Sequence, residues 1–397
     1  MSKETAALAV PVRRIHWLDG LRSGLMLLGV VLHAAYPYSL GSRWLVQDPQ
    51  RAQFFQWLTR GIHLFRMPAF FLIAGYFATL LLRRCGVADF LRERARRIGV
   101  PLLSTLLTFN LLQSWLLQKH GASATWLPTG QALQTLWSSG GVVGHLWFLV
   151  YLLVFCAVLA ACARPLRRLA ASSRWPARAA SVSGVWILLA AAVGCGLLVV
   201  ALEHLAPRAL DHEYLGLIDP AELLSYAPFF AMGTLLELDP SLLSRFSSPG
   251  PGSVLTGAIA LGAMVAESQG AGLEHKALHL LASSLLVWIV LRLLLGGFRR
   301  LANGASALFG YLSDASYSVY LMHHLFVVAL STWLLAADWG PWSKFATVLS
   351  LTLALSLAIH HFLVLRHPLL RFLFNGKPLH APEVDAVSAQ PARVGNP

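Results

Sequence analysis

Apolar runs of about 20 residues recur along almost the whole chain, and this repetition limits the fold more than any other feature. Within the hydrocarbon core of a membrane only helices and closed barrels satisfy every backbone polar group. With 56% hydrophobic and 12% charged residues, the chain leaves no room for a large soluble domain. The sequence therefore predicts an all-α integral membrane protein with a single transmembrane domain, residues 1–375, and a disordered cytoplasmic tail, residues 376–397.

We expect about ten transmembrane helices, of which the sixth and seventh are short. The first apolar run is long and lacks a small-x-small cleavage site, so we expect it to stay in the protein rather than to act as a cleaved signal peptide. The expected spans are 21–40, 61–82, 99–117, 143–163, 182–203, 223–238, 253–269, 276–297, 314–336 and 343–365.

The net charge of +13 fits membrane topology better than nucleic-acid binding. Lys and Arg gather in alternate loops, as the positive-inside rule requires. The basic segments are the N-terminus and the loops after spans two, four and eight, whereas the loop 204–222 is acidic. We therefore expect both termini in the cytoplasm, membrane lipid as a partner and no nucleic-acid partner.

Arg22 and His33 lie eleven residues apart in the first span. This spacing is about three helical turns, so both lie on one face, about 16 Å apart along the axis. Ionisable residues inside a span usually face a cavity, and a neutral imidazole accepts a hydroxyl proton readily near neutral pH. His33 is thus a candidate catalytic base, and Asp19 is a candidate for orienting Arg22. The structural alternative is that Arg22 anchors the helix end and His33 bonds a backbone carbonyl.

Two further groups of polar residues lie inside expected spans. His63 and Arg66 are one turn apart in span two, at about the depth of His33. Arg66 could line a pocket or snorkel to the outer interface, and the sequence favours neither. A second group opens span four and follows one face of span nine: His145, Tyr320, His323 and His324. Its histidines have no carboxylate within two helical turns, so we expect no metal site.

An arginine run, residues 92–97, follows span two. Guanidinium groups match phosphate oxygens well, although a basic loop touching anionic lipid would explain the same charges without a ligand. A phosphorylated carrier held there and by Arg22 could reach His33, because the pantetheine arm of coenzyme A covers roughly 16 Å, the helical distance from Arg22 to His33.

Together these segments resemble the acyltransferase-3 family of membrane acyltransferases over nearly the whole chain. The family's Arg-x10-His signature corresponds to Arg22 and His33. Its Arg-x-x-Arg element corresponds to Arg94 and Arg97. By this resemblance Arg22, Arg94 and Arg97 bind the phosphates of acyl-CoA, and His33 is the catalytic base.

Three more motifs match the same family in the same order. The family's Phe-Phe-x-Ile-Ser-Gly stretch corresponds to residues 70–75, with Ala74 in place of Ser. The others are the His-Leu-Trp-Phe-Leu opening at His145 and the Ser-Tyr-x-x-Tyr-Leu-x-His string over residues 316–323. Any one motif is weak, but the ordered set is specific.

The resemblance implies an O-acyltransferase of the bacterial inner membrane, and it is greatest to members that succinylate osmoregulated periplasmic glucans. We therefore expect succinyl-CoA as donor, a periplasmic glucan as acceptor and no permanently bound cofactor. Arg66 would pair with the succinyl carboxylate. The acyl or acceptor pocket is assigned to Arg66, His63, His145, Tyr320, His323 and His324.

Two alternatives stay open at this point. One is acyl transfer to another cell-envelope polysaccharide, such as O-antigen, and the other is a transporter or flippase for a lipid-linked sugar or glucan. Trp126 and Trp137 could stack on sugar faces or could anchor the chain at the interface.

Overall fold

The structure is a computed structural model that describes residues 15–41, 44–119, 143–171, 190–191, 193–198, 201, 218–267, 272–302, 304 and 306–379. These residues form helices and no sheet; one isolated bridge joins Ser39 and Ala52. Seven of the helices are long and apolar enough to cross a membrane, and the pair α13 and α14, bent by 65°, would make an eighth if it forms one span. The all-α membrane fold is confirmed.

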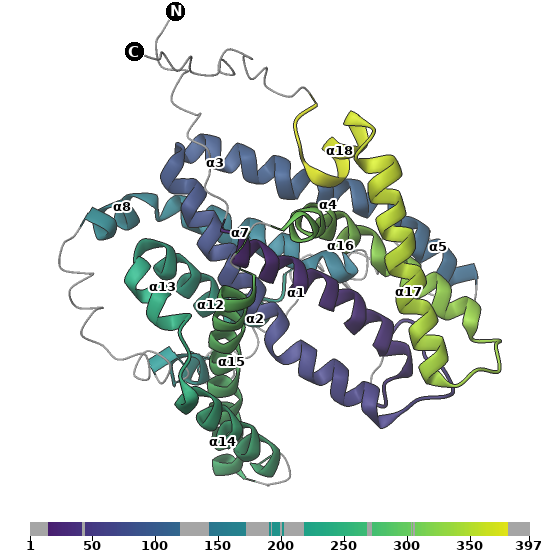
Figure 1. The fold of residues 1–397 in the computed structure, drawn as a ribbon, viewed down its shortest axis with the longest axis horizontal. Helices are drawn as coiled ribbons and strands as arrows, with labels where there is room; N and C mark the ends of the chain where they lie inside the picture. Colours follow the sequence, from purple (N-terminus) through teal and green to yellow (C-terminus); the bar gives the residue numbers. More distant parts are fainter. Residues whose placement is uncertain are drawn as a thin grey trace, which may run out of the picture.

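The described helices follow the expected spans closely (Figure 1). The fifth expected span lies mostly outside the described residues, and the sixth, α12, is not among the seven. The count of ten therefore stays a prediction. The helices are α1 His16–Ala35, α2 Gln53–Arg84, α3 Val87–Arg94, α4 Val100–Thr105, α5 Leu111–Lys119, α7 Trp147–Ala161, α8 Ala163–Ala171, α12 Pro220–Leu238, α13 Pro240–Phe246, α14 Pro251–Glu267, α15 Leu273–Leu301, α16 Ala307–Leu334, α17 Pro341–Ile359 and α18 Pro368–Asn375.

Short π-helical turns interrupt two of the spans. The segment Val87–Leu117 runs through α3, α4 and α5 with π turns at η2, Ala95–Gly99, and at η3, Leu106–Asn110. A third π turn, η5, His360–Val364, continues α17. Such turns rotate the side chains that follow them and are frequent at functional sites. Here η2 carries part of the arginine run, and η5 carries a buried histidine.

Helices α2 and α12 cross with their backbones in contact. A Cβ atom on Gly75 would collide with the Phe230 backbone, and one on Gly233 would collide with the Leu72 backbone. Only glycine allows such an approach without moving a helix. The Gly75 that ends the 70–75 motif therefore has a packing role in holding α12 against α2.

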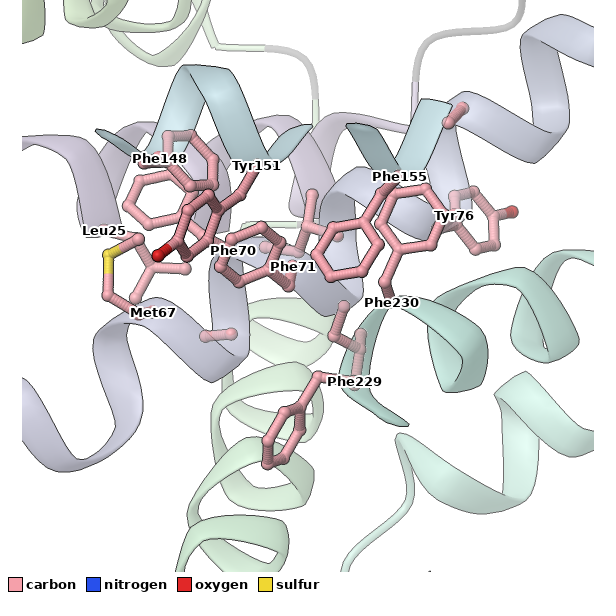
Figure 2. Close-up of a cluster of buried hydrophobic side chains, with 14 of the residues drawn as sticks. Leu25, Met67, Phe70, Phe71, Tyr76, Phe148, Tyr151, Phe155, Phe229 and Phe230 are labelled. Carbon is pink, nitrogen blue, oxygen red and sulfur yellow. The ribbon is translucent and has the colours of Figure 1, made fainter. Parts of the chain in front are cut away.

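Aromatic side chains fill the space between α2, α7 and α12 (Figure 2). The ring of Phe71 lies 5.1 Å from Phe148 and 5.3 Å from Phe155, and Phe155 stacks on Phe230 at 5.1 Å. Phe70 adds a tilted contact with Phe148 at 5.2 Å. Pairs at these separations stabilise a core beyond their buried area alone. This core fixes the positions of Phe70 and Phe148, which line the site.

The two ends of the helix bundle differ in chemistry. Exposed tryptophans gather where α2 begins, where α16 ends and where α17 begins, as at a membrane interface: Trp57, Trp333, Trp339 and Trp342. The opposite end carries arginines in the last turns of α2 and α15. This polarity agrees with the expected topology, although the assignment of the basic end to the cytoplasm stays a prediction.

The chain beyond α18 begins in a packed position. Gly376 has a φ of +59° and is buried, and a Cβ atom there would collide with the backbone of Arg96 and Arg97. The residues 376–379, which the sequence assigned to the tail, therefore start against η2. The disorder expected for 380–397 concerns residues outside the described part of the chain.

Candidate functional site

A cavity of about 600 Å³ lies at the basic end of the bundle. Helices α1, α2, α3, α7 and α16, together with η2, the last residue of α18 and the chain after it, supply its walls. Its outer part is cationic and its inner part is apolar, ending at Met26, Phe70 and Phe148. The cations on its wall are Arg22, Arg84, Arg94, Arg97 and Lys377.

A second, smaller chamber of about 50 Å³ begins where the large cavity ends. The two share Met26, Phe70 and Phe148 as lining residues. Apart from Met67, the remaining walls of the small chamber are polar or aromatic: His33, Arg66, His145, Trp147, Tyr320 and His323. A continuous series of lining residues thus leads from Arg22 to His33, the two residues that the helical spacing had placed on one face.

Arg22 is held at the wall of the large cavity by three neighbours. Its Nη2 donates to Ser313 Oγ at 3.0 Å and lies 3.5 Å from Asp19 Oδ1. The guanidinium also lies 5.8 Å from the Phe77 ring centroid. The expected contact with Asp19 is therefore present, and the cation keeps donors that face the cavity.

The two arginines of the Arg-x-x-Arg element differ in their surroundings. Arg97 Nε donates to Glu93 Oε1 at 2.9 Å, and Glu93 also pairs with Arg96. Arg94 lies over the Phe90 ring at 5.5 Å, and its buried Nε has no hydrogen-bond partner among the described residues. Arg94 is therefore the cation of this pair with more capacity left for an anion.

Sequence reasoning missed two cations of this cavity. Arg84 ends α2, and no carboxylate in the described ranges pairs with it. Lys377 lies 3.7 Å from Asp314 Oδ2. Arg84 belongs to none of the sequence motifs. Lys377 was expected in the tail, and it reaches the cavity wall because the end of α18 packs against η2.

Four imidazole rings, from α1, from α16 and from η4, Gly144–Leu146, meet beside the small chamber, and three of them line it: His33, His145 and His323. The centroid of His33 lies 5.1 Å from His323, 4.9 Å from His324 and 6.3 Å from His145. His145 and His324 stack at 4.5 Å with an interplanar angle of 8°. Trp44, from the segment between α1 and α2, contacts His324 at 5.5 Å and His33 at 6.4 Å. The cluster joins residues that the sequence separates by nearly 300 positions.

Hydrogen bonds fix the tautomers of two of these rings. His323 Nδ1 donates to the Tyr320 carbonyl at 2.7 Å, and His324 Nδ1 donates to Gln113 Oε1 at 2.6 Å. Each ring therefore has its Nε2 lone pair free to accept a proton or a hydrogen bond. In the described part of the chain, His323 Nε2, His33 Nδ1 and both ring nitrogens of His145 are buried without a partner.

Arg66 is the cation of the small chamber. Its side chain is only 7% exposed, so it does not snorkel to the interface. The guanidinium lies 5.9 Å from the Phe70 ring centroid, and no described carboxylate forms an ion pair with it. A buried cation without a counter-ion is costly, so the chamber is suited to an anionic group.

Other candidates lie apart from the chamber or outside the described residues. His63 is exposed on α2 and does not line either cavity. Tyr320, in contrast, is buried and donates to the His145 carbonyl at 2.8 Å. Trp126 and Trp137 fall outside the described residues. Within the described ranges no group of three or more His, Cys, Asp or Glu side chains is arranged to hold a metal ion.

The described residues thus form an all-helical membrane bundle in which a cationic cavity adjoins a chamber lined by histidines, which is the architecture of a membrane protein with charged and proton-accepting groups in its interior. The comparisons identify the class as a membrane acyltransferase. The sequence model of the acyltransferase-3 family, described as an acyltransferase domain, matches residues 15–361, and the chain belongs to this family.

Relatives are similar along their whole length. The chain is 29% identical over 389 residues to glucans biosynthesis protein C of Escherichia coli O81 (strain ED1a), covering 96% of this chain and 99% of the relative. It is 28% identical over 389 residues to glucans biosynthesis protein C of Escherichia coli (strain K12), again covering 96% and 99%. No solved structure matches the chain.

Proposed function

We propose that this membrane acyltransferase moves a succinyl group from cytosolic succinyl-CoA to hydroxyl groups of periplasmic glucans. The observation that carries the proposal is the pair of adjoining cavities, one lined by five cations and the other by His33. The name of the relatives, glucans biosynthesis protein C, supports the choice of acceptor. The protein would work in the bacterial inner membrane, with the basic end in the cytoplasm.

In this proposal the large cavity binds the coenzyme A part of the donor. Arg22, Arg94 and Arg97 contact its phosphates, and Arg84 and Lys377 add positive charge. The pantetheine arm lies along the apolar inner wall and passes Met26, Phe70 and Phe148. The thioester then lies in the small chamber, away from bulk water.

The chemistry needs only groups that the small chamber contains. His33 takes the proton of an acceptor hydroxyl, and the oxygen attacks the thioester carbonyl carbon. The C–O bond forms, the C–S bond breaks, and the imidazolium returns its proton to the leaving thiolate. The products are the acylated acceptor and free CoA thiol. A route through an acyl-enzyme would give the same products.

The choice of a succinyl donor follows from Arg66. The free carboxylate of a succinyl group has to enter a site of low polarity, where an unpaired charge is expensive. Arg66 is buried in the same chamber as His33 and lacks a carboxylate partner among the described residues. A charge-assisted hydrogen bond between the two groups would satisfy both.

Release of CoA thiol by the purified protein tests the proposal. The assay compares succinyl-CoA with acetyl-CoA, each with and without periplasmic glucan, in native protein and in His33→Ala. We expect release from succinyl-CoA that depends on glucan and is lost in the variant. If folded native protein releases no thiol from either donor, the acyl-CoA reaction is wrong and transport of a lipid-linked sugar becomes the better hypothesis.

A further inference from the structure

A buried asparagine on the wall of the large cavity has incomplete hydrogen bonding. Asn375, the last residue of α18, is 5% exposed and lines the cavity. Its Oδ1 accepts a hydrogen bond, but its Nδ2 has no partner among the described residues. The large majority of buried side-chain polar atoms have a hydrogen-bond partner, so an open donor on a cavity wall is a candidate for a ligand contact.

A relay behind the cavity wall holds this amide in one orientation. Ser318 Oγ donates to Asn375 Oδ1 at 2.7 Å, and His360 Nδ1 contacts Ser318 Oγ at 2.9 Å. A hydroxyl has one proton, so His360 donates to Ser318 while Ser318 donates to Asn375. Both Ser318 and His360 are fully buried. The relay therefore holds the oxygen of the amide and leaves Nδ2 as the free donor.

The backbone next to Asn375 is also held in place by packing. Gly376 ends α18 in a left-handed conformation and packs so closely on η2 that a Cβ atom would collide with the backbone of Arg96 and Arg97. The next residue, Lys377, lines the same cavity. Asn375 thus belongs to a rigid corner that also carries two of the cations of the cavity.

We propose that Asn375 is a donor-binding residue, whose Nδ2 donates a hydrogen bond to an oxygen atom of the bound acyl-CoA. The oxygen belongs either to a phosphate or to an amide carbonyl of the pantetheine arm, since both accept from an amide N–H. Ser318 and His360 are positioning residues that act through Asn375. This inference rests on the proposed function, because it takes acyl-CoA as the ligand of the cavity.

Two variants of Asn375 test the role of its Nδ2 donor, one of which keeps the hydrogen bond to Ser318. Asn375→Asp keeps an oxygen for Ser318 but replaces the free N–H with an oxygen, and Asn375→Leu removes the donor without adding charge. We expect each to raise the KM for succinyl-CoA about tenfold or more, with a smaller change in kcat. The Kd for CoA should rise by a similar factor, and Ser318→Ala should give a smaller increase.

A matched control is Asn110→Asp, because Asn110 is a buried asparagine that bonds the Val143 carbonyl and lines neither cavity. It should leave the KM for succinyl-CoA near the native value in protein that elutes as a single folded species. Native KM and Kd in both folded Asn375 variants would overturn the inference. An equal loss of affinity in the control would overturn it as well, because a general effect of a buried charge would then explain the result.

Fragments of the donor distinguish the two oxygen sources. Weaker binding of adenosine 3′,5′-bisphosphate to the Asn375 variants assigns the contact to a phosphate, and weaker binding of pantetheine assigns it to the carbonyl. If native protein neither binds CoA nor releases thiol, the proposed function itself fails. If native protein does both and the Asn375 variants match it, only the present inference fails.

Discussion

The guanidinium of Arg66 lies against Gly29, at the position that a Cβ atom of residue 29 would occupy. Gly29 is one turn before His33 on α1, whereas Arg66 comes from α2. The absence of a Cβ atom on α1 therefore allows the cation to lie beside the proposed base. A glycine on a helix face usually lets two backbones pack closely, but here it leaves space for a charged side chain.

The first prediction concerns this shared space. Gly29→Ala should push the Arg66 guanidinium away and lower succinyl transfer about 10- to 100-fold, the range expected for one charge-assisted hydrogen bond. Acetyl transfer should fall much less, because acetyl carries no carboxylate. The rates with the two donors are compared, and Gly61→Ala serves as control, since a Cβ atom there meets nothing within 4 Å. Equal losses with both donors would contradict the prediction.

The second prediction removes the cation itself. Arg66→Leu should impair succinyl transfer more than acetyl transfer, because the succinyl carboxylate would be buried without a partner. Arg66→Lys should recover part of the preference, since it restores charge but not the planar fork. The ratio of kcat/KM for the two thioesters is the measured quantity. A ratio unchanged in Arg66→Leu would remove Arg66 from substrate selection.

The third prediction addresses the base. His33→Gln keeps hydrogen-bonding capacity but cannot take a proton, and it should lower kcat by about 10²- to 10⁴-fold. Binding of CoA should stay close to native, because His33 lines the small chamber and not the large cavity. His361→Gln is the control, since His361 is exposed on η5. Near-native turnover in His33→Gln would show that another group takes the proton.

The fourth prediction concerns stability at the end of the bundle where α2 and α17 begin. Lys344 Nζ lies 2.7 Å from Asp48 Oδ2, and both side chains are 2% exposed. This pair ties the segment that carries Trp44 to α17. Lys344→Met should leave the carboxylate buried and uncompensated, at a cost of about 3 to 5 kcal/mol, which appears as a lower thermal midpoint in detergent.

The double variant Asp48→Asn with Lys344→Met provides the control for this pair. It leaves no buried charge, so it should be more stable than Lys344→Met alone. A double variant that is less stable by the sum of the two single effects would mean that the two charges do not interact.

Several features of the site could be predicted from the sequence. Helical periodicity alone places Arg22 and His33 on one face, and in the structure Arg22 lines the large cavity and His33 lines the adjoining small chamber. The contact between Asp19 and Arg22 follows from the same local geometry. These relationships lie within a single helix, where the rise and twist per residue fix which side chains are neighbours.

Relationships between helices were decided only by packing. Periodicity could not tell whether Arg66 snorkels or is buried, and it grouped the exposed His63 with the chamber. It also gave no sign that Gln113 would hold His324, or that Ser318 would hold Asn375.

The sequence by itself determined that the chain is a helical membrane protein, which positions share a helix face and which family its motifs match. The tertiary structure alone decided which of those faces meet, which polar atoms are left without partners, and that Lys377 belongs to the cavity wall. The physical reason is that hydrophobicity and helical period act locally. The close approach of α1 to α2 at Gly29, and of α18 to η2 at Gly376, depends instead on side chains far apart in the chain.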